Sequence, residues 1–272
     1  MLKKNQWDRS SLLIQGVARI DFNADIGESF AGYELGLDEE IVKYITSANI
    51  ATGFHAGDPD WMARTVALAV GHQVGIGAHP AYPDLAGFGR RNMDLTPGEV
   101  RNAVTYQVGA LSAFAPRRKL QHVKPHGALY NTAVKDPEVA SSVVSAIKEF
   151  DPELIHVVLA GSRWESIARD EGVRVARECY ADRAVTAQGT LVPRSEPGAV
   201  VHETGEIVER SIKLATEGKV IAVDGTEIEF SADSICLHGD TPGAVETAAA
   251  VRGALEDAGV KITPMAKLVS VV

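Results

Sequence analysis

Short apolar runs alternate with longer amphipathic segments along most of the 272-residue chain. The apolar runs have the length of strands, whereas the amphipathic segments repeat hydrophobic residues every third or fourth position, which is typical of helices. We predict strands at Arg19–Asp25, Ala48–Thr52, Val74–Ala78, Gln121–Lys124, Ile155–Ala160, Val173–Cys179 and Ser234–His238. The alternation predicts an α/β fold, a distorted seven-stranded parallel (β/α) barrel.

Local signals mark where several helices begin and where the alternation breaks. A capping residue precedes a proline at Asp58-Pro59, Thr96-Pro97, Asp136-Pro137 and Thr241-Pro242, and each pair predicts a helix start. The segment 219–230 turns about Asp224-Gly225, which predicts a β-hairpin. We therefore expect a single barrel domain over residues 18–272 with a hairpin insertion near 219–230. Residues 1–17 form an N-terminal extension, for which partial disorder is expected.

Five of the predicted strands end in a small cluster of His, Asp, Asn and Gly. The clusters lie at residues 20–28, 49–58, 74–80, 122–127 and 235–240. A core strand has no structural need for a polar, turn-prone end that recurs with the same residue types. In a barrel, catalytic groups come from the carboxyl ends of several strands, which meet at one pocket. The recurrence therefore indicates an enzyme.

The first cluster supplies carboxylates and the later clusters supply imidazoles. Asp21, Asn23 and Asp25 alternate with apolar residues, so their side chains share one face of the strand. Each of the other four clusters has a histidine at the strand end: His55, His79, His126 and His238. The remaining histidines lack this context and are expected at the surface or in packing: His72, His122, His156 and His202.

One carboxylate and two imidazoles form a common site for a divalent metal with open coordination positions. Asp25, His55 and His126 are the candidate metal ligands. Without a metal, the same residues serve as general acids and bases, and both interpretations stay open. Lys124 shares a strand face with His126 and is a fourth catalytic candidate, because its ammonium group would stabilise negative charge on a carbonyl oxygen.

Four residues are candidates for substrate binding: Asn23, His79 and His238 from these clusters, and Arg91 from the segment 87–91. Arg91 and its neighbour Arg90 lie in a glycine-rich segment, where either would clamp a carboxylate or a phosphate. Glu28 follows the first strand and is either an acid–base group or a loop charge.

Composition narrows the class of protein. Hydrophobic residues make up 45% of the chain and charged residues 23%, which is typical of a globular protein. The net charge of −9 gives no support to nucleic-acid binding. Cys179 and Cys236 lie far apart and are expected to be buried thiols. No apolar run reaches the length of a membrane span, and a cytoplasmic location is expected.

Neither GxxxxGK[ST] nor a GxGxxG between strand and helix occurs in the sequence. If ATP is used, it therefore binds at an unfamiliar site or together with a partner protein.

Several of these motifs occur in an order that resembles the LamB/YcsF family. They are Asp21–Glu28, Asn49–Asp58, Gly77–Asp84, Gly87–Arg91, Val123–Tyr130, Tyr180–Arg183, Leu191–Arg194 and His238–Asp240. The resemblance extends from residue 19 to the C-terminus and implies a barrel similar to polysaccharide deacetylases. It also implies ATP-dependent opening of 5-oxoproline to glutamate by a 5-oxoprolinase, in complex with partner subunits B and C. In related deacetylase-like barrels an Asp and two His hold a metal, a role that the resemblance transfers to Asp25, His55 and His126.

The activity fits the chemistry of a lactam, a stable amide whose carbonyl oxygen must be activated before water attacks the carbon. Two alternatives remain. The chain is a stand-alone metal-dependent deacetylase or amidohydrolase acting on a sugar or small amide, or it is a noncatalytic subunit that binds the substrate. Formation of a homo-oligomer also remains open.

Overall fold

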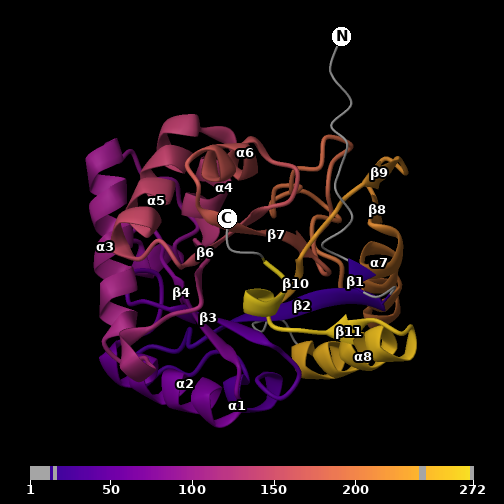
Figure 1. Cartoon of the computed structure of the whole chain (residues 1–272), viewed down its shortest axis with the longest axis horizontal. Coiled ribbons are helices and arrows are strands. Elements are labelled where there is room, and N and C mark those ends of the chain that lie inside the picture. Colours follow the sequence, from indigo (N-terminus) through magenta and orange to yellow (C-terminus); the bar gives the residue numbers. More distant parts are fainter. Residues whose placement is uncertain (1–12, 15–16, 239–242, 270–272) are drawn as a thin grey trace.

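Seven parallel strands close into a barrel in the computed structural model, which describes residues 13–14, 17–238 and 243–269 (Figure 1). Around the barrel they are β2 (Val17–Ile26), β3 (Ser47–Ala51), β4 (Gly75–His79), β5 (His122–Val123), β6 (Ile155–Leu159), β7 (Arg174–Tyr180) and β10 (Ser234–His238). Each strand pairs in parallel with the next, and β10 pairs with both β7 and β2. The predicted seven-stranded barrel is confirmed.

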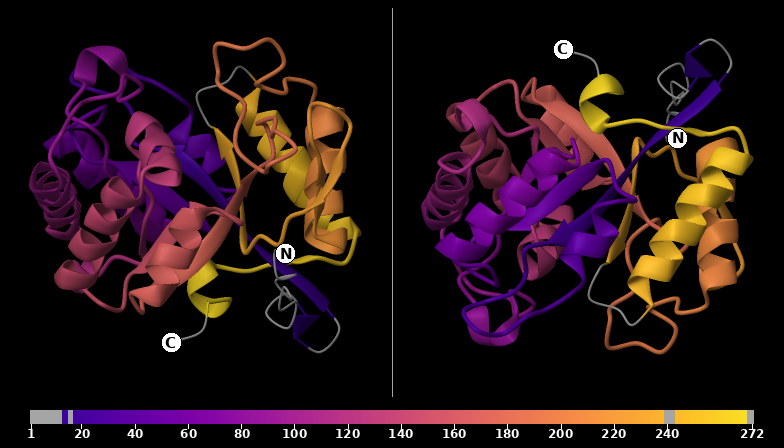
Figure 2. Two further views of the ribbon diagram at one scale, coloured as in Figure 1. Left: turned by 90° about the horizontal axis from the view of Figure 1, so that it is seen from above. Right: turned by 90° about the horizontal axis from the view of Figure 1, so that it is seen from below.

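The helices lie outside the strands in both views of Figure 2. They are α1 (Asp38–Ile41), α2 (Pro59–Gly71), α3 (Pro97–Ser112), α4 (Gly127–Lys135), α5 (Pro137–Phe150), α6 (Arg163–Asp170), α7 (Thr204–Glu217) and α8 (Ala244–Asp257). The side chains of Asp58 and Asp136 cap α2 and α5, and Thr96 with Glu99 forms a capping box on α3. These three helix starts are confirmed. Thr241-Pro242 lies outside the described residues.

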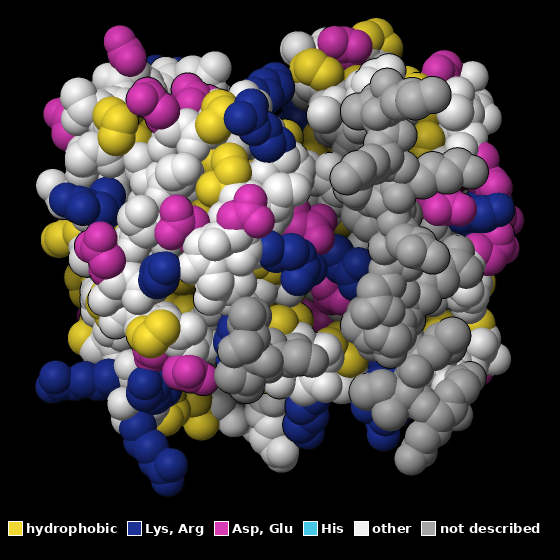
Figure 3. All heavy atoms as spheres, turned by 45° about the horizontal axis from the view of Figure 1, so that its top comes forward, with side chains coloured by type: hydrophobic (Ala, Val, Ile, Leu, Met, Phe, Trp, Pro, Cys, Tyr) yellow, Lys and Arg dark blue, Asp and Glu magenta, His cyan; other side chains and the backbone are white. Residues whose placement is uncertain are grey.

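None of the described helices is long and apolar enough to cross a membrane. On the face shown in Figure 3, acidic and basic side chains are intermingled and hydrophobic ones are scattered among them. Cys179 and Cys236 are both buried free thiols, as predicted.

Short elements decorate the barrel. β8 (Lys219–Ile221) and β9 (Glu227–Glu229) pair antiparallel on either side of Asp224-Gly225 and lie beside α7 (Figure 1). β1 (Leu13–Ile14) pairs antiparallel with the start of β2. Residues 1–12 and 15–16, the rest of the predicted extension, lie outside the described residues. Single 3₁₀ turns occur at Leu85–Gly87, Pro116–Arg118 and Met265–Lys267.

The C-terminal segment closes the barrel at the amino ends of its strands. β11 (Lys261–Ile262) pairs in parallel with β2. Met265 follows it, is fully buried, and packs against Ile155, Val157 and Ala176. The polar strand ends lie at the opposite, carboxyl end of the barrel, where the candidate site is built.

Candidate active site

The interior of the barrel is lined by polar side chains instead of the usual branched aliphatic ones. Asp21 lies deepest and is fully buried. Its Oδ1 accepts hydrogen bonds from the Ser47 hydroxyl (2.6 Å) and the Met265 amide (3.0 Å), and its Oδ2 accepts one from the Ser234 hydroxyl (2.5 Å). Burial outweighs these hydrogen bonds and raises the pKa of Asp21 to about 6.

Amide and imidazole groups connect the surroundings of Asp21 to Asp25, which lies nearer the carboxyl ends of the strands. The Asn49 side-chain amide donates to Asn23 Oδ1 (2.7 Å) and to Asp25 Oδ1 (2.8 Å), and Asn23 donates to the Ser234 hydroxyl (2.6 Å). His122 Nε2 lies 2.8 Å from Asn49 Oδ1, which can only accept, so this nitrogen carries the proton. We call Asp21, Asn23, Asn49, His122 and Ser234 the polar ladder.

A glycine makes room for the imidazole of the ladder. A Cβ added to Gly77 would lie 2.0 Å from the His122 ring. His122 was expected at the surface or in packing, and the structure places it inside the barrel, fully buried.

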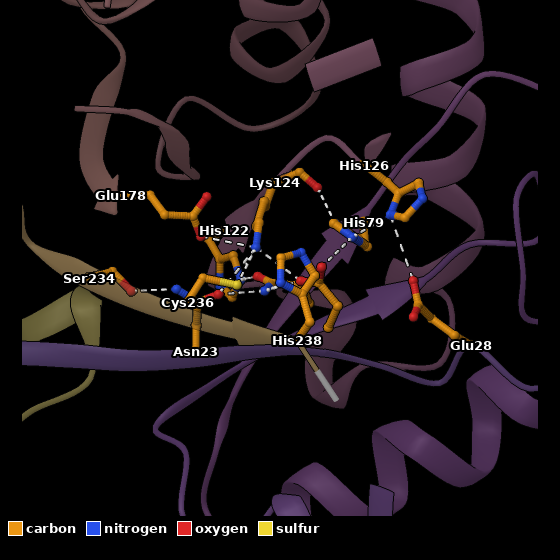
Figure 4. Close-up of polar contacts among 12 residues, drawn as sticks. Asn23, Glu28, His79, His122, Lys124, His126, Glu178, Ser234, Cys236 and His238 are labelled. Atoms are coloured by element: carbon orange, nitrogen blue, oxygen red, sulfur yellow. Dashed lines mark hydrogen bonds and ion pairs between the residues drawn. The ribbon is translucent and has the colours of Figure 1, made fainter. Parts of the chain in front are cut away.

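Lys124 lies at the centre of the site, with its side chain 1% exposed (Figure 4). Its Nζ is 2.9 Å from Asp25 Oδ1, 3.0 Å from Glu178 Oε1 and 3.0 Å from Cys236 Sγ. Burial alone would lower the pKa of Lys124, but Asp25, Cys236 and Glu178 raise it well above its usual value. Lys124 is therefore a fixed cation in the floor of the site.

Glu28 and three histidines gather above Lys124. One ligand atom from each of Glu28, His55, His79 and His126 lies within 4.8 Å of the others. The rings of His55 and His126 are stacked with centroids 3.8 Å apart, and His55 Nε2 is 3.1 Å from Glu28 Oε1. Burial, and then neighbouring histidines, hold the pKa of both His55 and His126 well below its ordinary value, so these rings are neutral.

Backbone carbonyls fix two of these imidazoles in complementary tautomers. His79 Nδ1 is 2.6 Å from the Lys124 carbonyl, and His126 Nε2 is 2.9 Å from the Phe88 carbonyl, so both of these nitrogens donate. Their other nitrogens, His79 Nε2 and His126 Nδ1, lie 3.0 Å apart, and His79 Nε2 also lies 3.2 Å from Asp25 Oδ2. A proton on His79 Nε2, or a metal ion between the rings, would satisfy these atoms.

These residues fit a divalent metal by the chemistry of their donors. Neutral imidazoles and one carboxylate form a donor set typical of zinc and similar ions. A backbone carbonyl that receives the second ring N–H is the usual support of a metal-bound histidine. His55 Nδ1, also buried, has no hydrogen-bond partner among the described residues. The set includes His55 and His126 from the predicted ligands, together with Glu28 and His79, and Asp25 lies beside it with Oδ2 3.2 Å from His79 Nε2.

A second acid–imidazole pair lies at the ends of β7 and β10. His238 Nδ1 is 2.8 Å from Asp182 Oδ2, and the His238 ring stacks on Tyr180 with centroids 5.5 Å apart. Burial alone would raise the pKa of Asp182, but His238 brings it below its ordinary value, so Asp182 is a carboxylate. His238 therefore donates from Nδ1 and keeps Nε2 for a ligand.

One cavity of about 360 Å³ lies at the carboxyl ends of the strands. Five of the predicted site residues line it: Asp25, His79, Lys124, His126 and His238. His55 lies behind the ring of His126 and reaches the site through Glu28. Asn23 is fully buried beneath the cavity, and its Oδ1 accepts hydrogen bonds from Asn49 and Lys124, which both also contact Asp25.

Arg91 is the predicted residue that the structure places apart from the cavity. Its guanidinium pairs with Asp84 and its side chain is 67% exposed. This pair ties together the two ends of the loop 84–91, and it holds the pKa of Asp84 down at about 2. The adjacent Arg90 lines the cavity instead.

Sequence reasoning did not single out Glu178 or Asp182. Glu178 lies in β7 next to Arg177, so nothing in the sequence shows that its carboxylate is fully buried and needs a cationic partner inside the barrel. Asp182 lay within a recognised motif, but its partner His238 is 56 residues away in sequence. Spacing alone gives no sign of that contact.

Comparison with known proteins identifies the family. The model of the LamB/YcsF family matches residues 20–270. The chain belongs to the LamB/YcsF family. The match covers all seven barrel strands except the first three residues of β2, and every residue of the cavity described above.

Similar LamB/YcsF proteins carry consistent names. A Thermococcus onnurineus protein, named as the A subunit of 5-oxoprolinase, is 55% identical over 253 residues, which are 92% of this chain and 99% of that protein. A Syntrophobacter fumaroxidans protein with the same name is 53% identical over 249 residues, 91% and 98% of the two chains. A crystal structure of a lactam utilization protein from Thermus thermophilus superposes with a TM-score of 0.85 at 47% identity. It covers 90% of this chain and 99% of that one.

Proposed function

We propose that the chain is one subunit of a 5-oxoprolinase that opens the lactam of 5-oxo-L-proline to L-glutamate, coupled to ATP hydrolysis. The observation that carries the proposal is the identity of 53–55%, over nearly the full length of both chains, to proteins named as the A subunit of 5-oxoprolinase. We further propose that residues 18–272 act as a single domain, in the cytoplasm, together with subunits B and C. ATP would bind with those partners, and the substrate with this chain.

The cavity offers the groups that lactam hydrolysis requires. Water adds to the lactam carbon, the ring C–N bond breaks, and the ring nitrogen gains a proton to become the amine of glutamate. Negative charge develops on the former carbonyl oxygen during the addition. Lys124, a buried cation in the cavity floor, would stabilise that charge, and Asp25 and Glu178 hold its ammonium in place.

His238 is the residue best placed to move the proton. Its Nδ1 donates to Asp182 at 2.8 Å, which leaves Nε2 to take a proton from water and to deliver it to the ring nitrogen. Asp182 stabilises the imidazolium form and fixes the tautomer. His238 lines the cavity, in line with its predicted place in the site.

Glu28, His55, His79 and His126 would hold a divalent metal. When bound, such an ion supplies Lewis-acid polarisation of a carbonyl or an activated water. Asp25 accepts from Lys124 and Asn49, and its Oδ2 lies 3.2 Å from His79 Nε2, so it would orient both the cation and the imidazole. Burial alone would raise the pKa of Asp25, but His79 and Lys124 bring it well below its usual value.

Reconstitution tests the proposal. The chain is co-expressed with subunits B and C, and both glutamate formation and 5-oxoproline-dependent ATP hydrolysis are measured on the purified complex. We expect the wild-type complex to show both activities. Asp25→Ala and His126→Ala should abolish glutamate formation, and His202→Ala, a control at an exposed histidine, should keep it. A folded complex that forms no glutamate overturns the proposal. Full activity in both site variants would leave a noncatalytic substrate-binding role.

The metal-capable cluster favours a second candidate, a stand-alone metal-dependent amidohydrolase acting on a sugar or a small amide. The chain alone, loaded with zinc or manganese and without ATP, would then hydrolyse such amides. Turnover by the isolated chain distinguishes this activity from the first, which needs both ATP and partners.

A further inference from the structure

Two arginines from the segment between β7 and α7 line the same cavity as Lys124 and His238. They are Arg183, which is 5% exposed, and Arg194, which lies at the exposed rim. In the sequence both are further candidates for clamping a carboxylate or a phosphate, after Arg90 and Arg91.

The guanidinium of Arg183 is held in a fixed orientation by its own loop. Its Nε donates to the Ala199 carbonyl at 3.1 Å and its Nη2 to the Val192 carbonyl at 2.6 Å. Within residues 17–238 and 243–269, its Nη1 has no hydrogen-bond acceptor. These contacts neutralise no charge, because a carbonyl carries none. Arg183 is therefore a positioned cation that forms no ion pair with a described carboxylate, and Asp182 offsets its charge only in part.

Arg194 adds a second positive charge close by. The Arg194 side chain makes no hydrogen bond or ion pair with any described residue. Its charge lies close enough to Arg183 to lower the pKa of Arg183, where burial is the larger cause. The neighbouring carboxylate, Asp182, is already engaged by His238. Two adjacent guanidinium groups at a cavity wall repel one another, and a bound anion relieves that repulsion.

Lys124 at the cavity floor and the two arginines differ in whether a protein carboxylate already pairs with them. Lys124 already has Asp25 and Glu178 as its counter-charges. The cavity is also lined by Leu159 and Leu191, which suit the methylene groups of a small ring. A ligand with an anionic end and a polar carbonyl end therefore matches the cavity.

We propose that Arg183 and Arg194 form the subsite that binds the carboxylate of a small cyclic amide, and so orient its carbonyl toward Lys124. This inference rests on the proposed function and deepens it, because it identifies the residues that make a carboxylate obligatory in the substrate. A planar guanidinium fork pairs with a carboxylate through two parallel hydrogen bonds. The Arg194 guanidinium forms no hydrogen bond with a described residue, so it loses none when it binds a carboxylate.

The experiment compares two ligands on the purified full-length chain by isothermal titration. One is 5-oxoproline, and the other is 5-oxoprolinamide, in which a neutral carboxamide replaces the carboxylate. We expect the wild-type chain to bind the acid about tenfold more tightly than the amide, as for one charge-assisted pair. Arg194→Ala should weaken binding of the acid about tenfold and leave binding of the amide within about twofold of wild type.

Matched variants separate recognition from folding. Arg101→Ala removes an exposed arginine that pairs with Glu149 on the outer helices, and it should leave both affinities unchanged. Arg183→Lys keeps the charge but loses the fork and its hydrogen bonds to the Ala199 and Val192 carbonyls, so we expect a weaker acid affinity and measure it at a temperature where the variant is fully folded.

Several results overturn the subsite. Equal wild-type affinities for acid and amide would do so, as would equal losses for both ligands in Arg194→Ala, or no binding of either ligand. Inorganic phosphate that binds in an Arg194-dependent way, with 5-oxoproline unaffected, would assign the arginines to a phosphoryl group and also overturn the proposal. Turnover by the complex is measured separately. A complex that forms no glutamate refutes the proposed function, while the acid–amide comparison still decides the subsite.

Discussion

The pairing of Asp182 with His238 allows a sharp test of how the site moves a proton. Asp182→Asn preserves the size of the side chain but removes the charge that accepts the 2.8 Å hydrogen bond from His238 Nδ1. The wild-type carboxylate is ionised, since His238 overcomes the effect of burial on its pKa. An asparagine amide can turn its NH₂ toward Nδ1, which then favours the tautomer with the proton on Nε2. In that tautomer His238 cannot accept a proton from water.

The size of the effect follows from the contact. A buried hydrogen bond to a charged group contributes about 1.5–3 kcal/mol, which corresponds to about 10- to 100-fold in the population of imidazolium. Loss of the general acid–base group itself, in His238→Asn, should cost about 10²- to 10⁴-fold in kcat. We therefore expect Asp182→Asn to lower kcat about 10- to 100-fold and His238→Asn to lower it further, with KM changed less than about threefold.

The assay is glutamate formation by the complex with subunits B and C, with kcat and KM measured separately. Asp224→Asn, an exposed aspartate in the hairpin turn, is the matched control and should keep wild-type kcat. Wild-type kcat in Asp182→Asn would refute the proton-transfer role. So would a loss of activity that follows a lower melting temperature and disappears when the variant is assayed at a temperature where it is fully folded.

Three further predictions address metal binding and stability. Zinc or manganese at about 100 times its Kd should stabilise the chain by about 2.7 kcal/mol, seen as a higher melting temperature, and a chelator should reverse the shift. His126→Asn should lose this shift and the exposed control His72→Asn should keep it, whereas equal shifts in both would exclude the cluster as the binding site. Burial lowers the pKa of His156 to about 3, so the unfolded chain binds the extra proton between about pH 6.5 and 3 and stability is lost as the pH falls through that window. In urea unfolding, His156→Phe should reduce the loss between pH 7 and 5 by about 2 kcal/mol, and an unchanged pH dependence would contradict it. A Cβ at Gly77 would lie 2.0 Å from the neighbouring imidazole, so Gly77→Ala should destabilise by about 1–3 kcal/mol, whereas Gly253→Ala, in an open helical position, should stabilise by about 0.5–1 kcal/mol. Destabilisation of the same size in both variants would show that the ring is not the cause.

The positions of the strands could be predicted because apolar runs and proline-marked helix starts are local signals. The contents of the barrel could be predicted only in part. Alternation in β2 correctly put Asp21, Asn23 and Asp25 on one face, and all three lie in the interior. Which groups they meet depends on register between strands. The parallel register places Asp25 opposite Asn49 and His238, and no spacing in the sequence contains that information.

Loop geometry explains the two largest differences between the predicted and the observed site. Glu28 reaches the histidines because the chain turns at Gly27, where φ is +70° and a Cβ would meet Ile50 and Thr65 at 3.1 Å. Arg90 and Arg91 are equivalent in the sequence. The 84–91 loop separates them, because Asp84 binds Arg91 and Arg90 is left at the cavity.

The polar ladder, finally, is better explained by orientation than by stability. Polar groups in a barrel interior lower stability unless every one is paired, and an aliphatic filling would avoid that cost. At Asp21 the cost is visible, since its hydrogen bonds do not offset burial and its pKa remains near 6. The ladder fixes the orientation of each of its side chains. The Ser234 hydroxyl donates to Asp21, so it must accept from the Asn23 amide. Asn23 Oδ1 therefore faces Asn49 and Lys124. The Asn49 amide in turn donates to Asp25. A chain of donors with one allowed orientation therefore fixes the carboxylate and the ammonium group on which the proposed chemistry depends.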